Sequence, residues 1–306
     1  MIRVLGRRLL FGLFAVWAVG TIVFGLLYLS GDPVALILAG SFGTPEYVER
    51  LRRDLGLDLP VHQQYLRFLG QALHGDLGRS LRWNQPALPL VLERLPATFQ
   101  LALAAIVLAV AVAVPAGVLA ATRPRSLLSR GAMLLAFVGQ SVPLFWLGIM
   151  LVLLVSVQLR WLPPGGRYGP ESLILPAITL GLYPMARIAR LTRSSMLEVL
   201  DEGYVVTARA KGLRESVVRY RHALKNAAIP IVTIVGLQLG AMLGGAVITE
   251  TVFAWPGVGS LTIQAIYNRD LPLAQAAVMV VSVLFVAISI GVDVAYAYLD
   301  PRIRHD

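Results

Sequence analysis

Apolar residues along the chain gather into long runs that polar stretches separate. A helix that crosses a hydrocarbon core of about 30 Å needs roughly 20 mainly apolar residues, and six runs fit this length. They cover about residues 9–29, 97–121, 132–157, 173–192, 229–249 and 275–298. The runs lack the alternation of apolar and polar residues that is typical of membrane barrels. The pattern predicts an all-α polytopic membrane protein with six transmembrane helices.

The fourth run, 173–192, is the least regular of the six. Pro176 and Pro184 interrupt it, and a series of three arginines at three-residue intervals begins at Arg187. Proline is tolerated in membrane helices whose neighbours satisfy the freed backbone groups, so these prolines favour a span that is buried in a bundle. We expect this span to end near Ile188.

A polar stretch of about residues 30–95 separates the first two runs. Within it, an amphipathic pattern from Val61 to Leu73 is followed by Gly75, which predicts a helix of that extent. Helix starts are also indicated at Asp32-Pro33 and Thr44-Pro45-Glu46, because capping side chains precede proline there. The apolar faces of such helices must pack on the membrane bundle or on an external partner.

Composition supports the membrane assignment. Hydrophobic residues make up 57% of the chain, charged residues make up 14%, and the mean hydropathy is +0.72. Because the chain has no cysteine, disulfides, thiolate metal sites and cysteine nucleophiles are excluded. The first apolar run is too long for a secretory signal and lacks a convincing cleavage site, so we expect it to be retained as a helix.

The distribution of cations orients the predicted spans. Arginines precede the first run, lie between the second and third, and are dense over residues 187–225, whereas 158–172 and 250–274 hold few. Cytosolic loops carry the excess of Lys and Arg, so the pattern predicts that the N and C termini are both cytosolic. The net charge of +10 then follows mostly from topology and indicates no nucleic-acid partner.

Four parts follow from this topology. Residues 1–30 are expected to form an N-terminal transmembrane helix, and 31–95 an extracytoplasmic insert with short amphipathic helices. Residues 96–299 are expected to form a five-helix core that includes a cytosolic loop at 194–228, and 300–306 a cytosolic tail.

The stretch from Tyr204 to Lys225 has the clearest functional pattern. Leu213, Val217, Tyr220 and Leu224 recur at helical spacing, with cations on the other faces, which predicts an amphipathic helix. A glycine before it, at position 212, can leave helical geometry, so a helix, a bend and a second helix are expected. Such a basic surface suits either a cytosolic partner or anionic lipid headgroups.

Catalytic chemistry is scarce in this sequence. No histidine falls inside a predicted span, and no cluster of histidine and carboxylate residues has metal-ligand spacing. The chain lacks a G-x-x-x-x-G-K-[ST] loop, and its lysines are Lys211 and Lys225 alone. We therefore expect no catalytic residue, no metal and no cofactor on this chain. If ATP is used, another subunit must bind it.

Ionisable and polar residues inside the spans are few. Asp293 lies near the cytosolic end of the last span, where a structural contact or ion coupling would explain it. Glu250 lies near the outer end of the fifth span, where it could face solvent or a pathway. Gln140, Ser141 and Gln238 could line a passage or form hydrogen bonds between helices. The shortage of acids near the midplane disfavours a secondary carrier.

Several motifs in order along the chain resemble those of permease subunits from binding-protein-dependent ABC importers, in the dipeptide/oligopeptide/nickel branch. They are Gly31-Asp32-Pro33-Val34, Gly75-Asp76-Leu77-Gly78, Arg94-Leu95-Pro96-Ala97-Thr98, Thr-Ala-Arg-Ala-Lys-Gly-Leu at 207–213, Glu250-Thr251-Val252-Phe253, Trp255-Pro256-Gly257-Val258-Gly259 and Asp300-Pro301-Arg302-Ile303-Arg304. Val206, His222 and Lys225 depart from the general loop pattern in ways that are usual for this branch.

The resemblance implies a type I ABC importer permease fold in the bacterial inner membrane. It also implies a second homologous permease, two cytosolic ATPase subunits that carry ATP and Mg, and an external solute-binding protein. The residues implied in ATPase coupling are Thr207, Ala208, Arg209, Ala210, Lys211, Gly212, Leu213, Arg214, Val217 and Arg221.

Gln140, Ser141, Gln238, Glu250 and Trp255 are the candidates for a pathway or outer mouth; a plain tight turn would equally explain Trp255. Di- and oligopeptides are the expected cargo of this branch. Nickel, a metallophore or a glutathione-like solute is the alternative, and an autonomous carrier or channel is a more distant one.

Overall fold

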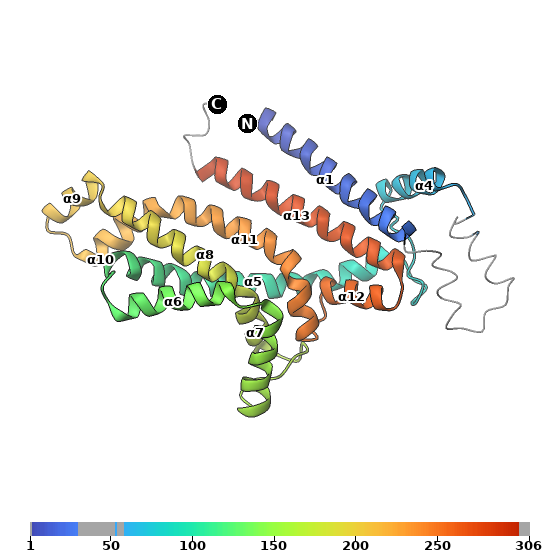
Figure 1. Ribbon diagram of the computed structural model, residues 1–306. Coiled ribbons are helices and arrows are strands. Elements are labelled where there is room, and N and C mark those ends of the chain that lie inside the picture. Colours follow the sequence, from blue (N-terminus) through green and yellow to red (C-terminus); the bar gives the residue numbers. More distant parts are fainter. Residues whose placement is uncertain (1, 30–52, 54–57, 300–306) are drawn as a thin grey trace.

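The computed structural model describes residues 2–29, 53 and 58–299, and the elements of this part are helices (Figure 1). In chain order they are α1 (Ile2–Leu29), α4 (Val61–Leu73), α5 (Ala87–Thr122), α6 (Leu127–Ser141), α7 (Leu144–Leu151), η1 (Val152–Gln158), η2 (Pro170–Leu173), α8 (Ile174–Leu200), α9 (Gly203–Ala210), α10 (Glu215–Val217), η3 (Val218–Ala223), α11 (Leu224–Val252), α12 (Val258–Tyr267) and α13 (Leu271–Leu299).

Within the part of the chain that the structure describes, five helical segments are long and apolar enough to cross a membrane. They are Gly6–Leu26, Ala87–Thr122, Pro170–Leu200, Glu215–Val252 and Leu271–Val292. A sixth span exists only if α6 and the segment formed by α7 and η1 are counted together, and these two meet at 110°. The run predicted over 132–157 is therefore two helices that meet at a bend, and the other five predicted spans are confirmed as helices.

The break between α6 and α7 has a local cause. Val142 has φ −83° and ψ 128°, an extended conformation, because the ring of Pro143 disfavours helical geometry in the residue before it. Pro143 then precedes the first residue of α7. Beyond the bend, α7 packs through Gly148 against Val252 at the end of α11.

The fourth predicted span is longer than expected, since α8 continues to Leu200 instead of ending near Ile188. The reason is that its buried face does not stop there. Ile188, Ala189 and Met196 are all buried, so the helix keeps packing on its neighbours as it leaves the most apolar part of the sequence.

Helices α5 and α8 lie at the centre of the bundle and approach each other closely at two levels. Gly117 on α5 faces Thr192 and the carbonyl oxygen of Ala189. Gly181 on α8 faces α5, where a Cβ atom would lie 2.8 Å from the carbonyl oxygen of Ala105. Small residues allow such close backbone packing in membrane bundles.

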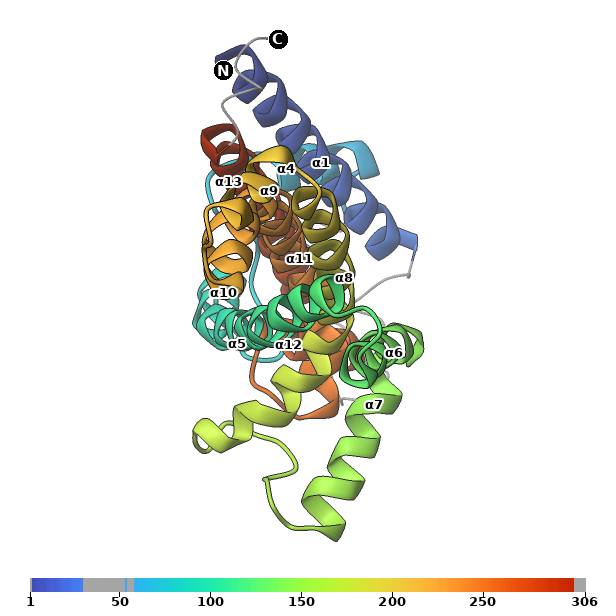
Figure 2. The same ribbon diagram turned by 90° about the vertical axis from the view of Figure 1, so that its left-hand side faces the viewer.

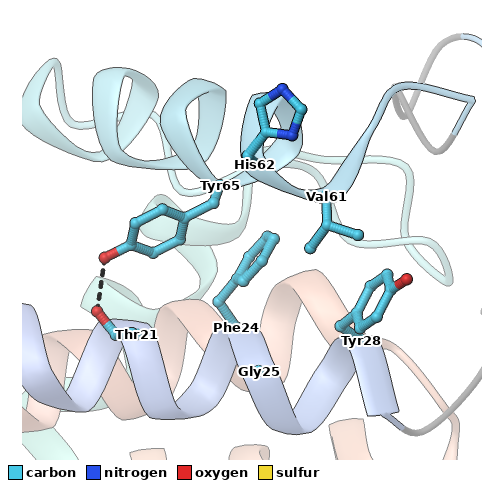
Figure 3. A pocket seen from close by; sticks show the side chains of 7 residues that line it. All are labelled: Thr21, Phe24, Gly25, Tyr28, Val61, His62 and Tyr65. Carbon is cyan, nitrogen blue, oxygen red and sulfur yellow. Dashed lines mark hydrogen bonds between the residues drawn. The ribbon is translucent and has the colours of Figure 1, made fainter.

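At the edge of the bundle, α1 lies beside α13, and α4 crosses over the end of α1 (Figures 1 and 2). The hydroxyl oxygens of Thr21 and Tyr65 are 2.7 Å apart, and the Phe24 ring packs 5.3 Å from the Tyr65 ring and 5.8 Å from that of Phe68 (Figure 3). The helix predicted from Val61 to Leu73 is thus confirmed, and it attaches to the bundle through an aromatic contact.

Some sequence predictions fall outside the described residues. These are the helix starts at Asp32-Pro33 and Thr44-Pro45-Glu46 and the tail at 300–306, and the side chain of Asp293 is likewise not described although α13 contains this residue.

Candidate functional site

The chain between α8 and α11 folds into a helix, a turn and a second helix, as the sequence predicts. Helix α9 ends at Ala210, and the second helix begins at Glu215 as α10. Through η3, this second helix continues into α11 without interruption, and the apolar segment as a whole spans Glu215–Val252. Figure 1 shows α9 and α10 at one end of the bundle, with α12 toward the other.

The turn between these helices depends on Gly212, whose φ is +74°. The Gly212 N–H donates to the Arg209 carbonyl at 2.9 Å, and the Leu213 N–H donates to the Ala208 carbonyl at 3.4 Å. This pair of bonds is the Schellman arrangement, which satisfies the last carbonyls of a helix and places a left-handed residue just beyond its end. An L side chain is strained at this backbone conformation, so the glycine fixes the angle between the helices.

A small apolar core holds the two helices of the loop together. Val205 and Val218 are fully buried and Ala208 nearly so, and all three pack against Val199 and Leu200 at the end of α8. The loop is therefore attached to α8 as well as to α11.

The apolar face of the second helix differs from the predicted one. Leu213 and Tyr220 were expected on it, but they are 40% and 56% exposed, whereas Val218 and Ala223 are buried. Leu213 lies in the turn before α10 and so outside the helix. Tyr220 lies in η3, whose π-helical hydrogen bonds add a residue to the turn and rotate the face that a regular α-helix would present.

Polar contacts tie the loop together at its surface. The Glu215 carboxylate lies 3.0 Å from Arg209 Nε and 3.3 Å from Arg219 Nε. Asn226 Nδ2 on α11 donates to the Tyr204 hydroxyl at 2.9 Å. Because the ion pairs are solvent-exposed, each contributes at most about 1 kcal/mol to the free energy of unfolding. Their main effect is to position the side chains of the loop.

Most of the residues singled out in this loop lie on its surface. Exposed are Thr207, Arg209, Ala210, Lys211, Gly212, Leu213, Arg214 and Arg221, whereas Ala208 is buried and Val217 half-buried. The exposed apolar side chains of Val206 and Leu213 lie among these cations. Such a surface can bind a groove that offers acidic and apolar groups.

A second polar cluster lies where α5, α11 and α12 meet. Glu250 is fully buried, and its carboxylate accepts hydrogen bonds from the Thr98 hydroxyl at 2.7 Å and the Ser260 N–H at 3.0 Å. Trp255 Nε1 donates to the Ala97 carbonyl at 2.8 Å. Glu250 and Trp255, which are candidates for a pathway or outer mouth, are both buried in this junction, where their polar atoms have hydrogen-bond partners.

The sequence alone assigned no role to Asp270, which belongs to a motif Arg269-Asp270 of the family resemblance and is buried just before α13. Its carboxylate accepts hydrogen bonds from the Ser80 hydroxyl and, at 3.1 Å, from the Leu81 N–H, so it clasps the stretch before α5 to the start of α13. The sequence does contain an indication of this role, because Asp270 is an acidic residue directly before the apolar run of α13.

The three polar pathway candidates occupy different settings. Gln238 is buried and accepts a hydrogen bond from Arg187 Nη1 at 3.3 Å, which links α11 to α8. The Ser141 hydroxyl donates to the Phe137 carbonyl within its own helix, and Gln140 is half-buried beside it. Among the described residues, no group of three or more His, Asp or Glu side chains could hold a metal ion.

The long apolar helices and the loop between them define the class of protein, which is a polytopic helical membrane protein. A solved structure of the MetNI methionine ABC transporter in inward-facing conformations shares this fold, with a TM-score of 0.59 and 19% identity. The alignment covers 69% of this chain and 96% of that one.

More particularly, the chain belongs to the family described as the inner membrane component of binding-protein-dependent transport systems. The family's sequence model matches residues 113–305, and a model of the N-terminal part of such membrane components matches residues 1–102.

Curated relatives extend over almost the whole chain. The dipeptide transport system permease protein DppB of Escherichia coli strain K12 is 42% identical over 90% of each chain. The di/tripeptide transport system permease protein DppB of Pseudomonas aeruginosa is 41% identical, with 100% of this chain and 99% of the relative covered. A dipeptide permease of Alkalihalophilus pseudofirmus is 40% identical over 98% of each.

Proposed function

We propose that this chain is the permease subunit of an ATP-driven importer of di- and oligopeptides, which a solute-binding protein delivers. Membership of the binding-protein-dependent family carries the transport role, and the relatives named for dipeptide and di/tripeptide transport support the cargo. In this proposal, a second homologous permease completes the passage. Two ATPase subunits bind ATP and Mg, and this chain itself performs no catalysis.

The loop at Asp201–Ala223 is proposed to bind the ATPase. Its surface carries cations and exposed apolar side chains, and its buried side holds Val205 and Val218 against the end of α8. Because the second helix runs directly into α11, a partner that moves the loop must also move α8 and α11. Packed bundles of this kind switch between discrete arrangements, so such motion can open one end of a passage and close the other.

The orientation in this proposal is the one the cations predict, with both termini and the loop in the cytosol. The stretch before α5 and the junction around Glu250 then lie at the external side. Gln140, Ser141 and Gln238 remain proposed contributors to the passage, either as wall residues or as links between its helices.

The coupling role can be tested with Lys211→Glu combined with Arg214→Glu in the complete transporter, reconstituted in proteoliposomes. Both side chains are exposed and neither belongs to the Glu215 ion pairs, so the fold of the loop should persist. We expect uptake of a labelled dipeptide and binding-protein-stimulated ATPase activity to fall at least tenfold, because charge repulsion weakens docking.

A matched control is Arg125→Glu combined with Arg130→Glu, which makes the same change of charge near the start of α6. It should leave uptake within about twofold of the wild type, an estimate for exposed side chains outside any contact. Full coupling in the Lys211 and Arg214 variant would contradict the proposal. Uptake of nickel but not of dipeptide by the wild type would support the alternative cargo.

A further inference from the structure

One face of α8 has a composition unlike that of the other membrane helices. Tyr183, Arg187, Arg190, Ser194 and Leu197 follow the spacing of a single helical face, and all are exposed in this chain. The most apolar window of the segment that contains α8 has a mean hydropathy of 1.4, compared with 2.1 to 2.6 for the other four spanning segments. The exposed face of α8 is thus cationic where the exposed faces of its neighbours are apolar.

Arg187 lies near the middle of the membrane bundle. It is halfway along α8, about 20 Å from either end of the helix at 1.5 Å per residue. Its hydrogen-bond partner, Gln238, is likewise at the middle of α11. The arginine is therefore remote from both ends of α8, and it lies within the apolar run 173–192.

Among the described side chains, Arg187 has contacts that hold its guanidinium but no acidic partner. Nη1 donates to Gln238 Oε1 at 3.3 Å, and the guanidinium carbon lies 5.8 Å from the centre of the Tyr183 ring. An amide oxygen and an aromatic face orient the guanidinium, but neither carries a negative charge. One hydrogen bond to Gln238 leaves the other N–H groups of the guanidinium able to donate to a further partner.

A cation at this depth cannot face lipid cheaply, and such residues line water-filled passages or meet a counter-charge. The exposed residues at the middle of other spans are apolar, for example Val107 on α5 and Val283 on α13. Those faces suit lipid, whereas the face of α8 suits a wet passage. The exposed face of α8 that carries Arg187 is therefore the face most suited to line the passage of the cargo.

We propose that Arg187, positioned by Gln238 and Tyr183, binds the free carboxylate of the peptide as it crosses the passage. The proposal rests on the proposed function, since it names the group of the cargo that the passage recognises. A guanidinium binds a carboxylate through two parallel hydrogen bonds. The terminal carboxylate is present on every unmodified peptide, so this contact does not depend on side chains.

The test compares uptake of a labelled dipeptide with uptake of its C-terminal amide by the complete transporter in proteoliposomes. Both cargoes are used at concentrations that saturate the binding protein, as a thermal-shift titration verifies. In the wild type we expect the free acid to enter about tenfold faster than the amide. Arg187→Gln should slow the free acid about tenfold, leave the amide unchanged and bring the ratio close to one, whereas Arg187→Lys should be intermediate.

Arg193→Gln is the matched control, because it removes the same charge from the same helix closer to Leu200; it should keep the wild-type ratio. The proposal would be overturned if Arg187→Gln slowed uptake of the free acid and of the amide equally while the complex stayed intact on size-exclusion chromatography. Loss of the second permease from purified Arg187→Gln complex would also overturn it, because the arginine would then pair with an acid of that subunit. A wild-type transporter that imports no peptide would instead refute the proposed function.

Discussion

Thr98 on α5 donates its hydroxyl hydrogen to the Glu250 carboxylate on α11 at 2.7 Å. The same hydroxyl oxygen accepts a hydrogen bond from the Val258 N–H at the start of α12, at 2.9 Å. One buried threonine therefore joins three helices. The Glu250 carboxylate also accepts a hydrogen bond from the Ser260 N–H. This junction fixes how the ends of α5 and α11 sit relative to each other.

Removal of the hydroxyl should weaken this junction. Thr98→Val keeps the volume but leaves the Val258 N–H without its acceptor and removes one donor from Glu250, which costs about 1–3 kcal/mol of unfolding free energy. Thermal unfolding in detergent would measure the loss. Thr98→Ser retains the hydroxyl and serves as the control, so equal stability of the two variants would contradict this role.

The turn of the loop gives a second prediction. A Cβ at Gly212 would meet no atom within 4 Å, so Gly212→Ala acts only through the backbone at φ +74°. The left-handed conformation costs an L residue about 1–2 kcal/mol. We expect faster hydrogen exchange over α9 and weaker coupling of ATPase activity to uptake.

Gly203→Ala is the matched control for this variant, because its site is equally open and its φ is not positive. Gly212→Asn should be milder than Gly212→Ala, since asparagine tolerates the left-handed region better. Identical exchange in Gly212→Ala and the wild type would show that the turn does not depend on the glycine.

The ion pairs of the loop should matter little for stability. Glu215→Gln removes both contacts with Arg209 and Arg219, but the carboxylate is half exposed, so a loss below about 1 kcal/mol is expected. Thermal unfolding at low and high salt would verify this. A loss of several kcal/mol that salt does not reduce would mean that these pairs are stronger than their exposure indicates.

The clasp at Asp270 should protect the stretch before α5 from proteolysis. Asp270→Ala leaves the buried Ser80 hydroxyl and the Leu81 N–H without their acceptor, so trypsin should cleave after Arg79 or Arg82 faster than in the wild type. Asp76→Ala is the control, since this acid accepts only an exposed hydrogen bond from the Gly78 N–H. Equal cleavage of both variants would rule out the clasp.

Close packing of α5 and α8 should tolerate no larger side chain. Gly181→Val places its Cβ against the Ala105 carbonyl oxygen, so the helices must separate, at a cost of about 1–3 kcal/mol or more. Gly244→Val on α11, where a Cβ meets no atom within 4 Å, is the control. Unfolding temperatures in detergent should fall for Gly181→Val alone.

Much of this architecture could be predicted from local pattern. The amphipathic stretch over Val61–Leu73 is a helix, five apolar runs are spanning helices, and the bend at Gly212 is where a glycine after a short helix indicates it. Periodicity and backbone sterics are local properties, so sequence alone is enough to read them.

The features that were not predicted depend on contacts between distant residues, on an irregular helical turn, or on a proline inside an apolar run. The burial of Glu250 follows from donors on α5 and α12, which are distant in sequence. The face of the second loop helix follows from a π-helical turn that apolar spacing does not reveal. The break at 132–157 had a visible signal, because Pro143 stands inside the run.

The arginines of α8 have a consequence for how the chain enters the bilayer during synthesis. On insertion scales, each arginine at the centre of a helix costs about 2.5–3.5 kcal/mol, so Arg187 opposes independent partitioning of this segment. Within the bundle, 61% of the most apolar window of the α8 segment is buried, largely against α5. Helix α8 therefore depends on contacts with α5, which is made before it, and with α11, which is made after it and supplies the partner of Arg187.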